Sequence, residues 1–217
     1  MNIAINKVHF PVTTLGYGRR VGIWTQGCSI RCPGCISRDT WEHDEERVTT
    51  VDLLATAVSS WLTAADGVTI SGGEPFDQPT ALAEFIREVR KVNNGDILVF
   101  SGYAQELLLE EHPEIIEMID VLVSDPYRPD SGTTLTLRGS DNQRISILTD
   151  LGRARYPAGL DFEPWAARRR LDIFFEGDAV WMAGIPQAGE MAHLRDELAR
   201  RGVACNTSDQ QHPRIRA

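Results

Sequence analysis

The sequence predicts an α/β protein built around a parallel sheet. Short apolar runs that favour strands alternate with longer stretches in which apolar residues recur at helical spacing. Two of the predicted strands end in loops rich in cysteine or glycine, and ligand sites of such sheets lie at the carboxyl ends of strands. The length of 217 residues suits one main domain with an appendage. We expect a core domain over residues 1–150 and a C-terminal extension over residues 151–217.

The core elements are predicted in alternation. A hydroxyl cap at Thr50 starts the first helix, Pro79 starts the second, and Asn94-Gly95 turns the chain into a strand. Strands that alternate with helices indicate parallel pairing through right-handed crossovers. The predicted strands are Arg20–Trp24, Val68–Ile70, Asp96–Phe100, Val121–Ser124 and Arg144–Leu148, and a helical stretch over 104–118 is interrupted at Pro113.

The extension is predicted to be a strand–strand–helix unit. Residues 171–175 and 179–183 read as two strands around a turn at Gly177-Asp178, and a helix over 189–201 ends at Gly202. The unit is expected to cap the open core or to dock a partner, and Arg168–Arg170 are expected to be solvated.

The charge and the apolar content of the sequence limit the kinds of partner that we expect. The net charge of −9, from 22 basic and 31 acidic residues, opposes binding to nucleic acid or to anionic lipid. No apolar run approaches the roughly 20 residues that span a bilayer, and the N-terminus does not resemble a signal peptide. We expect a cytoplasmic protein with reduced cysteines, no nucleic-acid partner and no membrane association.

Three of the four cysteines, Cys28, Cys32 and Cys35, fall in one short loop after the first strand. Thiolates at this spacing can converge on a soft-metal centre. One reading is a Cys3His zinc site completed by His43. The other is an iron–sulfur cluster in which three cysteines leave one iron open for catalysis. Cys205 is distant in sequence and is expected to be a small buried thiol.

A second unusual loop, Gly72-Gly73-Glu74-Pro75, follows the next predicted strand. The glycines allow a ligand to approach the backbone closely, and Glu74 offers an acceptor for a ligand ammonium group. Because both loops follow strands of one sheet, they are expected to lie side by side.

Together these residues resemble the radical S-adenosylmethionine superfamily, whose signature is Cys-x3-Cys-x2-Cys with a Gly-Gly-Glu-Pro-like motif. The sequence is most similar to the branch of anaerobic ribonucleotide reductase activating proteins and their single-cluster relatives. The likeness covers about residues 8–148 and includes Gly16–Arg20, Gly27-Cys28, Thr40-Trp41, Ser101–Tyr103, Asp120–Val123 and Arg138–Arg144.

The resemblance implies a partial (β/α)6-type barrel around one [4Fe–4S] cluster. Cys28, Cys32 and Cys35 would hold three irons, and the methionyl amino and carboxylate groups of S-adenosylmethionine would chelate the fourth. The cofactor-binding residues that it implies are Gly72, Gly73, Glu74 and Pro75 at the methionyl end, with Ser101 and Asp125 toward the ribose.

The implied activity is reductive cleavage of S-adenosylmethionine to a 5′-deoxyadenosyl radical, which takes a hydrogen atom from a substrate. An electron donor such as flavodoxin or ferredoxin would be required, and no side-chain acid or base would be. The leading expectation is an activase for a large glycyl-radical protein. A radical modification of a peptide or small molecule is the alternative, and a non-catalytic zinc module is the alternative of another class. Ile36 and Ser37 depart from the residues usual in the activating proteins, which weighs against ribonucleotide reductase as the target.

Overall fold

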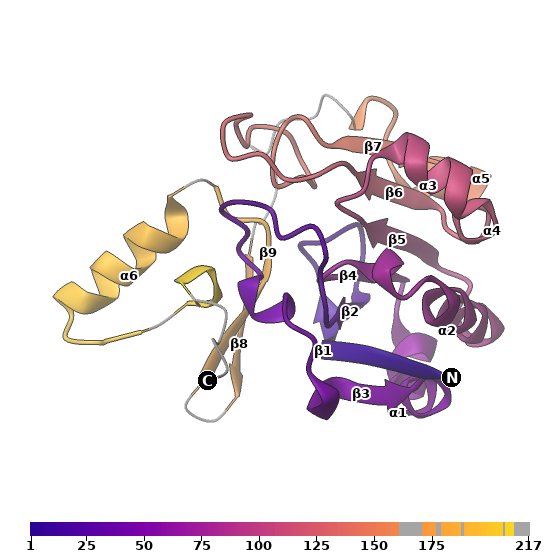
Figure 1. The fold of residues 1–217 in the computed structure, drawn as a ribbon, viewed down its shortest axis with the longest axis horizontal. Helices are drawn as coiled ribbons and strands as arrows, with labels where there is room; N and C mark the ends of the chain where they lie inside the picture. The colour runs from indigo at the N-terminus through magenta and orange to yellow at the C-terminus, as the bar shows by residue number, and fades with distance from the viewer. Residues whose placement is uncertain (161–170, 177–178, 188, 206, 211–217) are drawn as a thin grey trace.

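The computed structural model describes residues 1–160, 171–176, 179–187, 189–205 and 207–210. Its main feature is a seven-stranded sheet in the order β3-β1-β2-β4-β5-β6-β7, in which the four central strands run parallel (Figure 1). The strands are β1 (Asn2–Val12), β2 (Arg20–Thr25), β3 (Val48–Thr50), β4 (Gly67–Gly72), β5 (Asp96–Phe100), β6 (Val121–Ser124) and β7 (Arg144–Ile147).

The prediction of an α/β protein with a mainly parallel sheet is confirmed, and the pairing at its edges differs from the prediction. The predicted strands appear as β2, β4, β5, β6 and β7, but β7 runs antiparallel to β6. The sequence reading missed β1, which runs antiparallel to β2 and β3. In the described part of the chain antiparallel strands flank the four parallel strands on both sides, and closure of the sheet into a barrel is not observed there.

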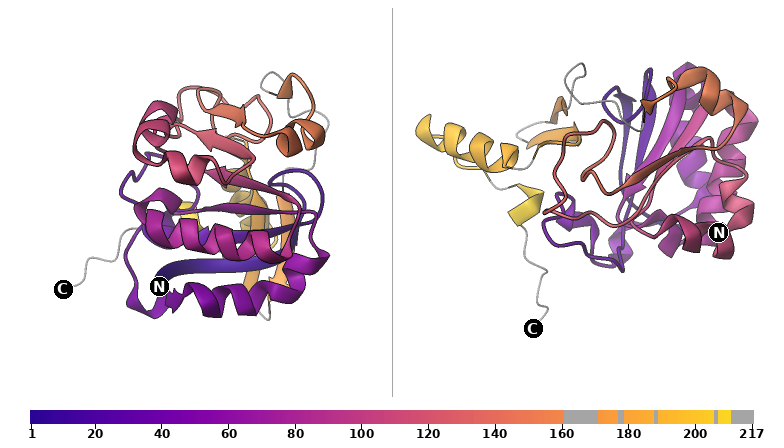
Figure 2. Two further views of the ribbon diagram at one scale, coloured as in Figure 1. Left: turned by 90° about the vertical axis from the view of Figure 1, so that its right-hand side faces the viewer. Right: turned by 90° about the horizontal axis from the view of Figure 1, so that it is seen from above.

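Helices cover one face of this sheet (Figure 2). They are α1 (Val51–Ala64), α2 (Pro79–Val92), α3 (Gln105–Glu111) and α4 (Pro113–Ile116), followed by the short α5 (Asp150–Arg155). The Thr50 hydroxyl accepts a hydrogen bond from the Leu53 N–H, so the predicted cap of α1 is confirmed.

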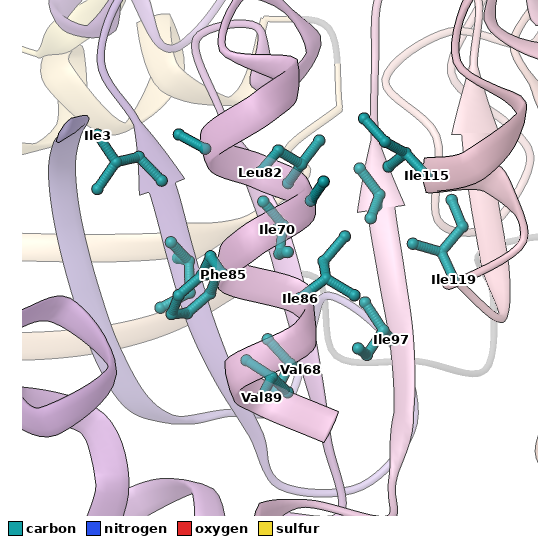
Figure 3. Packing of buried hydrophobic residues seen from close by; sticks show 14 of the residues in the cluster. Ile3, Val68, Ile70, Leu82, Phe85, Ile86, Val89, Ile97, Ile115 and Ile119 are labelled. Atoms are coloured by element: carbon teal, nitrogen blue, oxygen red, sulfur yellow. The ribbon is translucent and has the colours of Figure 1, made fainter. Parts of the chain in front are cut away.

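The core lies between α2 and the central strands. Leu82, Phe85, Ile86 and Val89 of α2 face the sheet, and each is at most 1% exposed (Figure 3). They pack against apolar strand residues, among them Val68, Ile70 and Ile97. Each such buried side chain contributes roughly 1.5–3 kcal/mol of burial free energy, and this contact fixes the carboxyl ends of the strands in one line.

Beyond α5, the C-terminal extension places its hairpin across the opposite face of the sheet, and its last helix extends away from the sheet (Figures 1 and 2). It holds the hairpin β8 (Leu171–Glu176) and β9 (Ala179–Gly184) and the helix α6 (Glu190–Arg200). The Trp181 ring packs edge-on against Trp24 with 4.9 Å between centroids, and Asp172 accepts hydrogen bonds from the Thr13 and Thr14 backbones. The predicted turn at 177–178 and the three arginines at 168–170 lie outside the described residues.

A buried polar cluster joins the strands at the end opposite their carboxyl ends. Arg20 and Asp96 are both fully buried and form an ion pair of 2.8 Å, and the Tyr156 hydroxyl donates to Asp96 at 2.9 Å. Tyr156 follows α5, so the chain beyond residue 150 is bonded directly to the core. The division at residue 150 stays a prediction, and these contacts cross it. No helix in the described ranges is long and apolar enough to cross a membrane.

Candidate cofactor site

The loops that follow β2, β4 and β5 surround one cavity of about 330 Å³. Cys28, Cys32 and Cys35 come from the first loop and Gly72, Gly73 and Glu74 from the second, and all six line the cavity. The sequence predicted that these two loops would lie side by side, and the structure brings them together there.

Backbone hydrogen bonds hold the cysteine loop in place. Gly27 N–H donates to the Thr40 carbonyl at 2.7 Å, and Cys28 N–H donates to the Trp41 carbonyl at 3.0 Å. The glycine loop then bonds to it, since Glu74 N–H donates to the Gly27 carbonyl at 2.9 Å. These contacts hold the start of the cysteine loop against the segment that follows it and against the glycine loop.

The three thiols are partly buried, and burial raises the pKa of each above its ordinary range. Neighbouring acidic groups add to the rise, as Glu74 does for Cys28 and Cys32. The site therefore disfavours three free thiolates, and a bound cationic centre would supply the missing charge. Soft sulfur donors of this kind match iron or zinc.

The three thiols on the cavity wall are a donor set that suits an iron–sulfur cluster. Across the described residues, no group of three or more His, Cys, Asp or Glu side chains is placed to hold one metal ion. In an iron–sulfur cluster each thiolate bonds a different iron, so the sulfurs stand further apart. His43, the proposed fourth zinc ligand, is an exposed side chain paired with Glu45 at 2.9 Å and does not line the cavity. Cys205 does not line it either.

The two glycines allow a close approach within the protein itself, and their role toward a ligand stays a prediction. A Cβ atom on Gly73 would stand 2.0 Å from the Gly27 carbonyl oxygen, and one on Gly72 would stand 2.3 Å from the Thr25 backbone nitrogen. Gly72 also has a φ of +109°, which favours glycine. The absent side chains allow Gly73 to meet the cysteine loop and Gly72 to meet the end of β2, and both glycines also line the cavity.

Glu74 is 1% exposed and joins the glycine loop to the loop after β5. Its carboxylate accepts hydrogen bonds from Phe76 N–H at 3.0 Å, Ser101 Oγ at 2.9 Å and Gly102 N–H at 2.7 Å. Burial raises its pKa to about 7 despite these bonds. A carboxylate has about four acceptor positions, so roughly one is left for a ligand cation.

The remaining predicted cofactor-binding residues have other partners. Ser101 lines the cavity, but its hydroxyl donates to Glu74 and accepts from Tyr103 N–H at 3.1 Å. Asp125 pairs with Arg144 at 2.6 Å and is not a lining residue. Pro75 is buried at the start of the 3-10 helix Pro75–Asp77.

The sequence reading missed several lining residues. Trp41 and Tyr127 come from irregular segments of the core, and Arg195 and Asp209 come from the extension. Arg195 lies on a helix that largely faces solvent, and the sequence of that helix gives no sign that this arginine faces a site. Trp41 belongs to a segment that carries the family resemblance, but no local pattern marks its place in the cavity.

Comparisons with known proteins match the region that carries the site. A family model described as a 4Fe-4S single cluster domain matches residues 14–146. The anaerobic ribonucleoside-triphosphate reductase-activating protein of Escherichia coli (strain K12) is 27% identical over 149 residues, 64% of this chain and 96% of the relative. The protein of the same name from Enterobacteria phage T4 is 28% identical over 142 residues, 62% of this chain and 88% of the relative.

A third relative is an activator of a different enzyme. The pyruvate formate-lyase 1-activating enzyme of Escherichia coli (strain K12) is 29% identical over 159 residues, which is 70% of this chain and 61% of the relative. The matched family region contains the three thiols and the glycine loop, and it ends before α5.

Proposed function

Because this chain belongs to the family of 4Fe-4S single cluster domains, within the radical S-adenosylmethionine superfamily, we propose that it is an activase that generates a radical on a partner protein. Its cofactors are a [4Fe–4S] cluster and S-adenosylmethionine. When bound, this pair supplies the electron and the sulfonium whose reductive cleavage gives a 5′-deoxyadenosyl radical.

In this proposal Cys28, Cys32 and Cys35 would hold the cluster, which would leave one iron free to bind the methionyl end of S-adenosylmethionine. The observation that carries the proposal is the shared cavity, in which three thiols stand beside a buried carboxylate. The unfilled acceptor position of Glu74 is available to the methionyl ammonium group. The glycine loop would then act mainly by holding Glu74 against the cysteine loop.

The hairpin of the extension shields the cavity from water in this proposal. Phe174 and Trp181 stack with 5.0 Å between centroids, and Trp181 packs edge-on against Trp24, which lines the cavity. Aromatic cover of this kind excludes water, and a radical intermediate requires this exclusion.

The proposed partner is a protein whose glycine yields the hydrogen atom, as the names of the relatives suggest. The electron donor would be a small carrier such as flavodoxin or ferredoxin. One observation favours the second candidate, a radical modification of a peptide or small molecule. Residues 147–217 follow the family match, and Arg195 and Asp209 from this segment line the cavity. The extension could thus select a substrate that the relatives do not use.

The test begins with anaerobic reconstitution of the full chain with iron and sulfide. Reduced protein is incubated with S-adenosylmethionine, and methionine and 5′-deoxyadenosine are quantified. Stoichiometric release of both supports the proposal, and release that persists in a Cys28→Ala variant contradicts it.

A second arm separates the two candidate substrates. A candidate glycyl-radical partner is added, and a glycine-centred radical is sought by electron paramagnetic resonance. The activase proposal predicts this signal only in the presence of partner, cofactor and reductant together. Consumption of a peptide or small molecule without a protein radical favours the second candidate.

A further inference from the structure

The C-terminal turn Ser208–Gln210 contacts the backbone that follows the third cysteine. Ser208 Oγ donates to the Ile36 carbonyl at 2.7 Å, and the Arg38 guanidinium donates to the Asp209 carbonyl at 3.3 Å. In Figure 1 and in the right-hand view of Figure 2, the yellow turn lies beside the purple cysteine segment. Asp209 lines the same cavity as the three thiols, so this turn is part of the wall around them.

An ion pair between Arg195 of α6 and Asp209 lies in this wall. Nη1 of Arg195 donates to both carboxylate oxygens of Asp209, at 2.9 and 2.8 Å, and to the Thr207 hydroxyl at 2.6 Å. The two charged side chains are only 18% and 24% exposed. Burial raises the pKa of Asp209, but hydrogen bonds from Thr207 and Arg195 outweigh burial and leave that pKa below its ordinary value. The pair is therefore ionised at neutral pH, and its two charges balance.

The other side chains that the extension contributes to the cavity are mostly apolar. Ile185 and Pro186 follow β9, and Met191 belongs to α6. In the described part of the extension, Arg195 and Asp209 are the charged residues among those that line the cavity. A mostly apolar lining with a few fixed polar groups is typical of ligand sites, in which the polar groups orient the ligand.

The reductase-activating relative of Escherichia coli is too short to hold a counterpart of this part of the wall. Of its length, 96% is matched by 64% of this chain, and the family match ends at residue 146. The extension therefore adds Arg195 and Asp209 to a cavity whose thiols lie in the shared region. Residues added in this way suit the choice of a substrate, because the shared region already holds the residues proposed to bind the cofactors.

The charge balance of the pair favours a neutral ligand group. A cation or an anion gains from one partner of the pair about what it loses to the other. A neutral group with one acceptor and one donor can instead use both partners, since a guanidinium only donates and a carboxylate only accepts. A peptide group is of this kind, because it fixes one C=O and one N–H in a plane. Every glycine inside a protein chain is flanked by two such groups.

We propose that Arg195 and Asp209 are specificity-determining residues that bind a peptide group of the substrate. The guanidinium donates to the carbonyl of that group, and the carboxylate accepts from its N–H. The inference rests on the proposed function, and it names the substrate as a neutral peptide segment beside the glycine that yields the hydrogen atom. Ile185, Pro186 and Met191 would pack against this segment and exclude water from it.

The first experiment compares two probes that differ in one group. N-acetylglycine N-methylamide is neutral, and N-acetylglycinate has a carboxylate in place of the second peptide group. Their dissociation constants are measured by saturation-transfer NMR on the full chain after anaerobic reconstitution, with S-adenosylmethionine present and no reductant. We expect the neutral probe to bind about tenfold more tightly. Tighter binding of N-acetylglycinate, or no binding of the neutral probe, overturns the inference.

The second experiment removes the donor. Arg195→Gln should weaken binding of the neutral probe about tenfold, because a hydrogen bond from a charged donor is lost. Arg200→Gln is the matched control, since Arg200 lies on the same helix, is 64% exposed and does not line the cavity. Its affinity for the probe should equal that of the unaltered protein, and iron content is measured on each sample. Equal losses in the two variants contradict a role for Arg195.

The third experiment removes the balancing charge. Asp209→Asn keeps the shape of the side chain and leaves Arg195 without its carboxylate partner. The preference should reverse, so that N-acetylglycinate binds more tightly than the neutral probe. Misfolding cannot produce this result, because it is a gain of binding. An unchanged preference for the neutral probe overturns the role of Asp209.

The outcomes separate this inference from the proposed function. If the reduced chain releases 5′-deoxyadenosine but prefers the anionic probe, the inference fails alone. If the neutral probe is preferred and the reversal appears, yet the chain takes up no cluster, the proposed function fails and the peptide site stands.

Discussion

The carboxylate of Glu74 accepts a hydrogen bond of 2.7 Å from the backbone N–H of Gly102, and so joins the loops that follow β4 and β5. The same carboxylate faces the cavity beside the three thiols. One side chain therefore both fixes the shape of the site and sets its negative charge. Its pKa of about 7 makes that charge sensitive to pH near neutrality.

Glu74 should give the protein without cofactors an unusual pH dependence. Burial raises its pKa from 4.5 to about 7, so the folded state holds this proton more tightly than the unfolded state does. The folded protein therefore loses stability as pH rises from about 4.5 to 7, by about 3 kcal/mol from this group. Urea unfolding across this range should show the slope, and Glu74→Gln should flatten it. An equal slope in Glu74→Gln would assign the effect to another group, and exposed Glu46→Gln is the control.

The same substitution should weaken binding of S-adenosylmethionine to the cluster-loaded protein. A charge-assisted hydrogen bond contributes about 1.5–3 kcal/mol, so we expect Glu74→Gln to reduce affinity by about one to two orders of magnitude. Anaerobic calorimetry measures this, with iron content determined on the same sample. Full affinity in an iron-loaded variant would remove Glu74 from ligand recognition.

Gly73→Ala should disturb the cysteine loop itself, not merely obstruct the ligand. The new Cβ would lie 2.0 Å from the Gly27 carbonyl oxygen, so one of the two loops must move. We expect reduced iron loading together with reduced ligand affinity. Gly159→Ala is the control, because a Cβ there meets no atom within 4 Å and only its φ of +88° opposes the change. Normal iron loading in Gly73→Ala would show that the loops can separate without harm to the thiols.

Cys28→Ala, Cys32→Ala and Cys35→Ala should each lose most of the bound iron, and Cys205→Ala should keep it. Only the first three thiols line the cavity. Iron and sulfide analysis after anaerobic reconstitution measures the difference. Loss of iron from Cys205→Ala alone would reverse the assignment.

Tyr156→Phe should reduce stability without altering the cofactor chemistry. The hydroxyl is buried and donates to Asp96 at 2.9 Å, at the end of the sheet away from the cavity. Loss of this bond leaves a buried carboxylate oxygen with one donor fewer, which costs about 1–3 kcal/mol. Urea unfolding should register this cost, while Arg153→Gln, which breaks an exposed pair, should change stability by less than about 0.5 kcal/mol. A stability equal to that of the unaltered protein would mean that water replaces the hydroxyl.

Local sequence patterns were sufficient to predict the central strands and most helices. Buried parallel strands such as Asp96–Phe100 are continuous apolar runs, and caps such as Thr50 mark helix starts. The first strand was missed because its pairing with β2 shifts register between Ile5 and Lys7, which breaks the alternation of apolar residues. The direction of β7 was missed because an apolar run does not encode strand direction.

The candidate site also has one part that the sequence predicts and another part that it does not. The motif residues Cys28 and Glu74 are recognisable from their residue types and spacing. The sequence alone therefore predicted that their loops lie side by side. The division at residue 150 stays a prediction, and the contacts of Ser208 and Asp209 with the segment after Cys35 cross it. A hydroxyl that donates to a distant backbone carbonyl leaves no pattern in the sequence, since every residue offers the same carbonyl.

The hydrogen bond from Ser208 to the Ile36 carbonyl spans 172 residues of chain and gives the site an order of assembly during synthesis. A ribosome adds about 5–20 residues per second, so the thiols are made roughly 10–35 s before the turn that completes their wall. During that interval the nascent protein carries the three thiols proposed to bind the cluster without the last part of the wall around them. Insertion of iron before release from the ribosome would meet an unfinished and more accessible pocket, and insertion afterwards would meet the closed one.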